Sequence, residues 1–229
     1  MGLERKNEDM PEVIFNGSAG RIEGRYYAGR EKDAPIALIL HPHPKHGGTM
    51  NNKIVYGLYR CFVDQGFSTL RFNFRGVGRS EGCYDNGEGE LSDAASALDW
   101  LQSTHPHVSR FWVAGFSFGA WISMQLLMRR PELEGFISVS PPANMYDFNF
   151  LAPCPVSGQI IQGSEDTVVP HTSVETLVTK LRNQKGISID YQLVDQADHF
   201  YADQLPALCQ HVDQYLSYRL KSNQQSIAV

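Results

Sequence analysis

The sequence predicts one α/β domain with a mostly parallel β-sheet and helices on both faces. Short apolar runs of strand length alternate along the chain with segments whose apolar residues recur at helical spacing, a pattern typical of parallel sheets with helical crossovers. The length of 229 residues and the hydrophobic fraction of 42% fit a single domain with a large core. We expect this domain to cover residues 11–220, between a mobile N-terminal tail at 1–10 and a C-terminal tail at 221–229.

The first two predicted strands form a hairpin. They cover residues 13–15 and 21–27, and the intervening sequence Asn16-Gly17-Ser18-Ala19-Gly20 has strong turn chemistry. Six further strands are predicted at residues 35–40, 67–74, 110–114, 135–140, 156–161 and 187–194. The run at 35–40 is continuously apolar, as expected of a strand covered on both faces, whereas the last strand alternates apolar and polar residues.

Five helices are predicted from apolar residues spaced three and four positions apart. They cover residues 52–65, 90–103, 120–130, 173–183 and, less sharply bounded, 201–220. Gly66 is expected to end the first helix and Pro131 the third, because glycine favours the left-handed end of a helix and proline cannot continue one.

Charge and composition argue against several classes of protein. The formal net charge is −5, and no basic stretch interleaved with aromatic residues suggests a nucleic-acid surface. No apolar run reaches the length of a transmembrane helix, so no membrane partner is expected. The first ten residues are charged and lack the apolar centre of a secretory signal. The four cysteines are far apart and form no C-x-x-C pair, so we expect free thiols and a cytoplasmic location. They are Cys61, Cys83, Cys154 and Cys209.

The sequence Gly115-Phe116-Ser117-Phe118-Gly119 lies between a predicted strand and a predicted helix. In this context G-x-S-x-G is the nucleophile elbow of serine hydrolases. The strained turn holds the serine hydroxyl clear of the sheet edge, at the positive N-terminal end of a helix. The alternative is a tight turn that contains an inert serine, because the pattern also occurs by chance. The strand-to-helix context favours Ser117 as a nucleophile.

A nucleophilic serine needs a base that takes its proton and a carboxylate that orients the base. In hydrolases with this elbow, the order along the chain is serine, acid, histidine. Asp166 follows the predicted strand at 156–161, and His199 follows the strand at 187–194. Because the carboxyl ends of parallel strands share one edge of a sheet, we expect Asp166 and His199 to lie near Ser117.

Each of these partners has an alternative interpretation. Asp166 taken alone is typical of a turn or a helix cap, and His199 taken alone is an ordinary loop histidine. Glu165 is the adjacent rival for the acid, and Asp195 and Asp198 share the loop of His199. The joint order along the chain favours the triad Ser117, His199 and Asp166.

Two backbone N–H groups are expected to stabilise an oxyanion near Ser117. The first is that of Phe118, directly after the nucleophile. The second should come from the loop after the strand at 35–40. Pro42 and Pro44 have no N–H, so His43 between them is the best candidate donor.

Two other motifs suggest a cofactor, but a structural role is expected for both. His41, His43 and His46 could suggest a metal site, but they do not have the spacing of a closed zinc site, and we expect no metal. The structural alternative to metal binding is that His41 hydrogen-bonds neighbouring loops. The glycines of residues 74–82 lack the spacing of a phosphate-binding loop, so no nucleotide cofactor is expected. Arg75 and Ser80 of this segment are expected to brace adjacent loops.

Taken together, these motifs resemble the α/β-hydrolase superfamily over about residues 11–220. The matching segments are residues 41–48, 75–80, 115–119, 163–166 and 198–199. Within it, the chain is similar to a small lidless bacterial group marked by His-Pro-His-Pro, Gly-Gly-Thr-Met-Asn-Asn and Arg-Phe-Asn-Phe-Arg, related to dienelactone hydrolases and serine peptidases. The resemblance implies an eight-stranded sheet and the catalytic triad Ser117, Asp166 and His199. Dienelactone hydrolases proper use a cysteine, so the serine here argues against dienelactone chemistry.

Many members of this superfamily carry a lid after the strand that follows the elbow helix. Here residues 141–155 occupy that place, and they are too few for a helical cap domain. Tyr146, Phe148 and Phe150 are candidates to line an apolar acyl pocket, with simple packing over the sheet edge as the alternative.

The expected function is therefore that of a carboxylesterase-like serine hydrolase. It would cleave small or medium acyl esters through an acyl-enzyme and would need no partner other than this small-molecule substrate. The alternatives are a peptidase or thioesterase that uses the same site, and a non-catalytic binding module that retains the fold.

Overall fold

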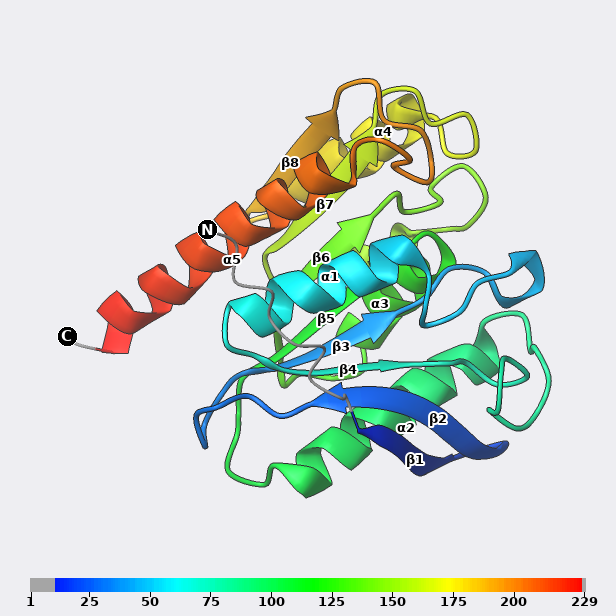
Figure 1. The fold of residues 1–229 in the computed structure, drawn as a ribbon. Helices are drawn as coiled ribbons and strands as arrows, with labels where there is room; N and C mark the ends of the chain where they lie inside the picture. The colour runs from blue at the N-terminus through cyan, green and yellow to red at the C-terminus, as the bar shows by residue number, and fades with distance from the viewer. Residues whose placement is uncertain (1–10, 228–229) are drawn as a thin grey trace, which may run out of the picture.

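Eight strands form a single twisted sheet in the computed structural model, which describes residues 11–227 (Figure 1). The strand order is β1-β2-β4-β3-β5-β6-β7-β8. β2 pairs antiparallel with β1 and with β4, and every other neighbouring pair is parallel. The strands are β1 (Glu12–Gly17), β2 (Gly20–Tyr27), β3 (Ile36–Leu40), β4 (Ser68–Phe72), β5 (Phe111–Phe116), β6 (Leu133–Val139), β7 (Gly158–Gly163) and β8 (Ile189–Val194).

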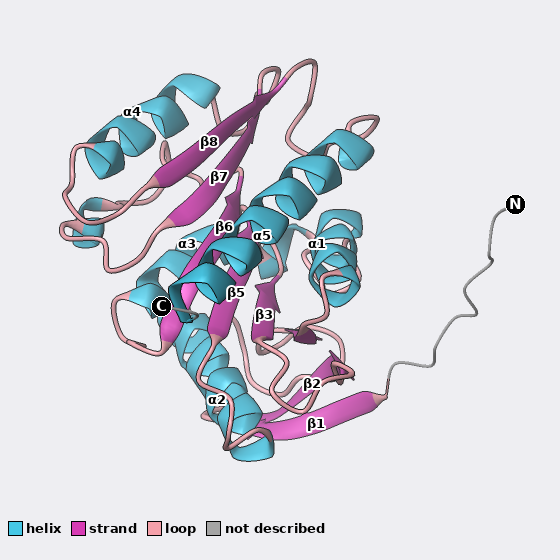
Figure 2. Cartoon of the chain, turned by 90° about the vertical axis from the view of Figure 1, so that its left-hand side faces the viewer, coloured by secondary structure: helices cyan, strands magenta, loops and turns pink. Residues whose placement is uncertain are grey.

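Helices cover both faces of this sheet (Figure 2). Those of the described residues are α1 (Lys53–Asp64), α2 (Glu88–Thr104), α3 (Phe118–Leu127), α4 (His171–Arg182) and α5 (Leu205–Ile227). Apolar side chains of α2, α3 and α4 belong to one buried cluster, and those of α1 and α5 belong to a second cluster. The sheet therefore has one hydrophobic core on each face, which explains why its central strands are continuously apolar.

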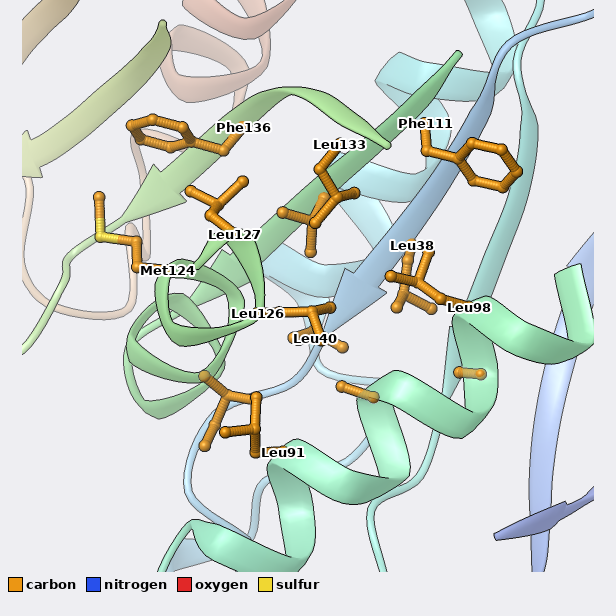
Figure 3. Close-up of a cluster of buried hydrophobic side chains, with 14 of the residues drawn as sticks. Leu38, Leu40, Leu91, Leu98, Phe111, Met124, Leu126, Leu127, Leu133 and Phe136 are labelled. Atoms are coloured by element: carbon orange, nitrogen blue, oxygen red, sulfur yellow. The ribbon is translucent and has the colours of Figure 1, made fainter. Parts of the chain in front are cut away.

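Leucines dominate the core between the sheet and the pair α2 and α3. Figure 3 shows Leu98 of α2 and Leu126 of α3 beside Leu38 and Leu40 of β3. All four side chains are fully buried. This packing fixes α3 against β3, and the start of α3 is where the elbow turn lies.

The predicted fold class is confirmed, including the number of strands and the helices on both faces. The hairpin turn is also as predicted, since Gly17 pairs with Gly20 across a two-residue turn. The connection from β6 to β7 contains only the 3-10 helix η2 (Asn149–Leu151) and no cap domain. The expected N-terminal tail at 1–10 lies outside the described residues.

The boundaries of α5 differ from the prediction at both ends. It begins at Leu205 instead of residue 201, because Tyr201 has a φ of 50°, which a right-handed helix does not allow. It also continues to Ile227, so the expected tail from residue 221 is helical up to that point. Residues 221–227 contain neither glycine nor proline, and nothing in their sequence ends a helix.

Candidate active site

The elbow between β5 and α3 holds Ser117 in a strained conformation. Its φ is 54° and its ψ is −117°, and it directly precedes the first residue of α3. The two flanking glycines are required by close approach. A Cβ on Gly115 would lie 2.3 Å from the carbonyl oxygen of Gly119, and a Cβ on Gly119 would lie 2.5 Å from that of Leu40. Glycine therefore allows α3 to start directly above the end of β3.

His199 links Ser117 to Asp166. The Oγ of Ser117 lies 3.2 Å from Nε2 of His199, and Nδ1 of His199 lies 2.7 Å from Oδ2 of Asp166. The three residues come from the ends of β5, β8 and β7, which meet at the carboxyl edge of the sheet. Both His199 and Asp166 are 6% exposed, so water competes little for the bond between them.

The carboxylate of Asp166 is held from both sides. Its Oδ1 accepts hydrogen bonds from the backbone N–H groups of Val168, at 2.9 Å, and Val169, at 2.7 Å. Its Oδ2 accepts from Nε2 of Gln162 at 3.0 Å in addition to the bond from His199. Burial alone would raise the pKa of Asp166, but these hydrogen bonds outweigh it and hold the pKa below its ordinary value. Asp166 is therefore a carboxylate at neutral pH.

The rival acids lie elsewhere. Glu165 is exposed, and its backbone N–H donates to the carbonyl of Ala197. Asp198 uses Oδ1 to accept from Phe200 and Ala202 within its own loop. Asp195 is also exposed, and its carboxylate lies near the side chain of Gln196. Of the four candidates, only Asp166 is brought to His199.

The loop after β3 lies against the start of α3. The ring of His43 is centred 4.9 Å from the ring of Phe118, so these two residues are neighbours in space. Phe118 is the first residue of α3, where the backbone N–H has no partner within the helix. A Cβ on Gly48 would lie 2.0 Å from the carbonyl oxygen of Pro42, which shows how tightly this loop folds back on itself. The expected oxyanion donors, the N–H groups of Phe118 and His43, are thus on adjoining segments.

Two side chains from the end of β4 clamp the far end of this loop. The N–H of Met50 donates to Oδ1 of Asn73 at 2.8 Å, and the carbonyl of Met50 accepts from Nη1 of Arg71 at 2.6 Å. The same Arg71 nitrogen donates to Oδ1 of Asn51 at 2.7 Å. The sequence alone did not indicate a role for Arg71 or Asn73, because these contacts join residues twenty or more positions apart.

His41 has a structural role at the start of the loop after β3. Its Nδ1 donates to the carbonyl of Pro42 at 2.7 Å, and its Nε2 accepts from the N–H of Phe74 at 3.0 Å, so both nitrogens are occupied. Its complete burial lowers its pKa to about 4 and keeps the ring neutral at pH 7. Within residues 11–227, no three His, Cys, Asp or Glu side chains are grouped so that they could bind a metal ion.

The glycine-rich segment after β4 braces neighbouring loops, as predicted from its sequence. Arg75 forms a two-pronged ion pair with Asp93 of α2, at 3.0 Å and 2.7 Å. The hydroxyl of Ser80 donates to the carbonyl of Asn73 at 2.7 Å and accepts from the N–H of Glu23 at 3.1 Å. These contacts join the segment to β2, β4 and α2.

The three candidate pocket aromatics have different surroundings. Tyr146 is half-buried and stacks on Trp121 of α3 with ring centroids 4.2 Å apart. Phe148 is only 8% exposed and belongs to the core, and Phe150 stacks on it at 6.0 Å. Phe148 and Phe150 therefore fit the alternative of simple packing, whereas the ring of Tyr146 lies 6.2 Å from that of Phe118, the residue after Ser117.

Two further aromatic residues lie close to Phe118, the residue after Ser117, and the sequence alone did not indicate them. Tyr84 places its hydroxyl 3.2 Å from Nε2 of His43, and its ring lies 6.1 Å from that of Phe118. Trp121 has its ring 5.7 Å from that of Phe118. Trp121 follows Ser117 by four residues, and residues with this spacing lie on the same face of a helix. This spacing in the sequence could have indicated that Trp121 lies near Ser117.

Comparison with known proteins places the chain among hydrolases. Residues 21–214 match the family described as X-Pro dipeptidyl-peptidase (S15 family). The chain is 52% identical over 211 residues to an uncharacterized protein of Rickettsia prowazekii, covering 90% of this chain and 89% of that one. It superimposes with a TM-score of 0.91 on an α/β hydrolase of unknown function from Agrobacterium tumefaciens, which is 60% identical, covering 93% of this chain and 97% of that chain.

Two more distant proteins are also similar to this chain. A serine hydrolase without a lid from Xanthomonas campestris is 29% identical with a TM-score of 0.82, covering 93% of this chain and 95% of that one. A lysophosphatidylserine lipase of Bos taurus is 26% identical over 191 residues, which are 74% of this chain. The match spans 46% of the length of the lipase, so the chain corresponds to about half of that relative.

Proposed function

We propose that this chain, which belongs to the S15 family of the α/β-hydrolase superfamily, hydrolyses small or medium acyl esters. The observation that carries the proposal is the hydrogen-bonded series from Ser117 through His199 to Asp166. The series lies at the carboxyl edge of the sheet, and its serine stands on a strained turn at a helix N-terminus.

In this mechanism, Ser117 Oγ attacks the ester carbonyl while Nε2 of His199 takes its proton. The carboxylate of Asp166 accepts a hydrogen bond from Nδ1 of His199 and thereby holds the ring in the tautomer that can accept that proton. The N–H groups of Phe118 and His43 stabilise the oxyanion of the tetrahedral intermediate. His199 then returns the proton to the departing alcohol. Water, activated by the same histidine, releases the acyl group from Ser117.

Half-buried aromatic residues beside the nucleophile support an acyl substrate of low polarity. Tyr84, Trp121 and Tyr146 all lie close to Phe118. Rings of this kind offer a large apolar surface while their polar atoms remain hydrogen-bonded. We therefore propose that Tyr146, with Tyr84 and Trp121, contacts the acyl group. The similarity to a lysophosphatidylserine lipase agrees with ester chemistry.

A second candidate activity is peptide hydrolysis. It is favoured by the match of residues 21–214 to the X-Pro dipeptidyl-peptidase family. The acyl-transfer mechanism of Ser117 would be the same, and only the leaving group would be an amine.

Location is part of the same proposal. The four cysteines are free, which agrees with the reducing conditions of a cytoplasm. Among the described helices, none combines the length and the apolar character that a membrane span requires.

Activity on two substrate series tests the proposal. The wild type and Ser117→Ala would be assayed with p-nitrophenyl esters and with X-Pro p-nitroanilides. We expect the wild type to hydrolyse the esters and Ser117→Ala to hydrolyse neither series. Turnover of anilides in preference to esters would support the peptidase. If neither series is hydrolysed, the non-catalytic binding module becomes the better account.

A further inference from the structure

The middle of the loop after β3 is joined to the rest of the fold through the ring of His43. Nδ1 of this ring accepts from the backbone N–H of Lys45 at 3.2 Å, within the loop. Nε2 lies 3.2 Å from the hydroxyl of Tyr84, which belongs to the segment between β4 and α2. Among the described residues, this is the one hydrogen bond that joins residues 43–47 to a segment outside the loop. The position of this part of the loop therefore depends on Tyr84.

The two hydrogen bonds of the His43 ring define its tautomer. Because Nδ1 accepts from a backbone N–H, the ring proton lies on Nε2 and is donated to the hydroxyl oxygen of Tyr84. Burial lowers the pKa of His43, and the nearby His46 and Lys45 lower it further, so the ring is neutral at pH 7. Burial also raises the pKa of Tyr84, so its hydroxyl keeps its proton. The bond between the two side chains is thus a bond between neutral groups.

The backbone of His43 is restricted in the same way as its ring. Its φ of −53° and ψ of 122° lie in the region that a residue before proline prefers, and Pro44 follows it. Its carbonyl accepts from the N–H groups of His46, at 3.0 Å, and Gly48, at 3.1 Å. Its own N–H has no acceptor among the described residues. This N–H therefore remains available to bind an oxyanion.

Tyr84 is itself held from α2 and from the loop. The buried carboxylate of Glu90 accepts from the backbone N–H groups of Asp85, at 3.0 Å, and Gly87, at 2.7 Å. On the other side, Nζ of Lys45 lies over the Tyr84 ring, 4.6 Å from its centre. These contacts fix the residues that follow Tyr84 and one face of its ring. The phenol hydroxyl is therefore a defined point of attachment for His43.

We propose that the hydroxyl of Tyr84 is a positioning group, which acts through Nε2 of His43 to hold the N–H of His43 where the oxyanion forms. This inference rests on the proposed ester hydrolysis, in which that N–H is one of two oxyanion donors. In this role the hydroxyl acts on the loop and not on the substrate. The ring of Tyr84 keeps its proposed contact with the acyl group.

Loss of the hydroxyl should lower kcat and leave KM almost unchanged. An oxyanion donor interacts with charge that develops in the transition state, and the bound ester carries little of that charge. Removal of a whole oxyanion donor lowers kcat by about 10²–10³-fold. A donor that is displaced but still present should cost less, and we expect a loss of about tenfold.

Tyr84→Phe tests the inference, because it removes the hydroxyl and keeps the ring. We expect kcat for p-nitrophenyl butyrate to fall about tenfold while KM changes by less than about twofold. Tyr218→Phe is the matched control, since it makes the same change at a tyrosine of α5 that is 66% exposed. This control should leave kcat and KM unchanged. Thermal unfolding would verify that each variant is folded.

His43→Phe removes the same hydrogen bond from the other side and covers the case in which Tyr84→Phe does not fold. It should lower kcat at least as much, because it also loses the bond from the N–H of Lys45. The double variant should lose no further kcat, because both changes remove one interaction. A further loss of about tenfold in the double variant would mean that Tyr84 acts on the substrate directly, and it would overturn the inference. A raised KM with an unchanged kcat in Tyr84→Phe would also overturn it.

The proposed function and this inference fail in different ways. A wild type that hydrolyses the butyrate, with full kcat in Tyr84→Phe and in His43→Phe, contradicts the positioning role and leaves ester hydrolysis intact. A wild type that hydrolyses no ester contradicts both.

Discussion

Replacement of Asp166 by asparagine should almost abolish turnover, because the surroundings of the carboxylate contain only donors. One oxygen accepts from the N–H groups of Val168 and Val169, and the other accepts from Gln162 and His199. In either orientation, the NH₂ group of an asparagine would face two N–H donors. If it faces His199, the ring must take the other tautomer, with its proton on Nε2, and it can no longer accept the proton of Ser117.

The expected loss of turnover is about 10⁴-fold if the precedent of serine proteases applies, where the same substitution leaves the histidine in the wrong tautomer. Stability should fall by about 2 kcal/mol, because hydrogen bonds to a charged acceptor are each worth about that amount. The assay is turnover of the best ester substrate, together with urea unfolding at neutral pH.

Glu165→Gln is the matched control, since this side chain is adjacent in sequence but exposed. It should retain turnover within about threefold of the wild type, in line with the small effects of exposed substitutions. The assignment of Asp166 as the orienting acid would be refuted if Glu165→Gln lost activity while Asp166→Asn kept it. If both variants were active, Asp195 or Asp198 would become the candidate for the orienting acid.

Three further predictions concern the fold and the loops around the site. Gly119→Ala should lower stability by about 3 kcal/mol and remove activity, because its Cβ would meet the carbonyl of Leu40 at 2.5 Å; a melting temperature equal to the wild type would contradict this. Burial lowers the pKa of His41 from 6.5 to about 4, so below pH 6.5 the unfolded chain binds a proton that the folded chain does not. Stability should therefore fall by about 3 kcal/mol between pH 6.5 and pH 4. His41→Gln should lose this part of the pH dependence of the unfolding free energy, measured by urea unfolding. If the unfolding free energy of the variant changed with pH as much as that of the wild type, the pH dependence would not come from His41. Four thiols should titrate after denaturation without reductant, and chelators should leave ester turnover unchanged; activity that zinc restores after chelation would reopen the histidine loop as a metal site.

The elements of this fold follow from local patterns, and for that reason most of them could be predicted. Central strands such as β3 and β5 are apolar throughout because a helix layer covers each face. The elbow was recognisable because its requirements are local: a strand, a turn with two glycines, and a helix. Asp166 and His199 could be placed because each lies in the loop after a strand of a parallel sheet.

The residues that support the site could not be predicted, because their roles come from contacts over long distances in sequence. Asn73 and Arg71 hold Met50 from a neighbouring strand. In the sequence, Gln162 is only one residue of a predicted buried strand. Its hydrogen bond to Asp166 becomes visible only in the folded structure. For Phe148, composition does not distinguish a residue that lines a pocket from one that fills the core, and only burial decides between the two.

The claim that Ser117 is the nucleophile is tested most directly by covalent labelling. Folded wild-type protein would be treated with a fluorophosphonate probe, digested, and the modified peptide identified by mass spectrometry. We predict a single adduct on the peptide that contains Ser117, no adduct in Ser117→Ala, and a greatly reduced labelling rate in Asp166→Asn. An adduct on another serine, or labelling that persists in folded Ser117→Ala, would contradict the account.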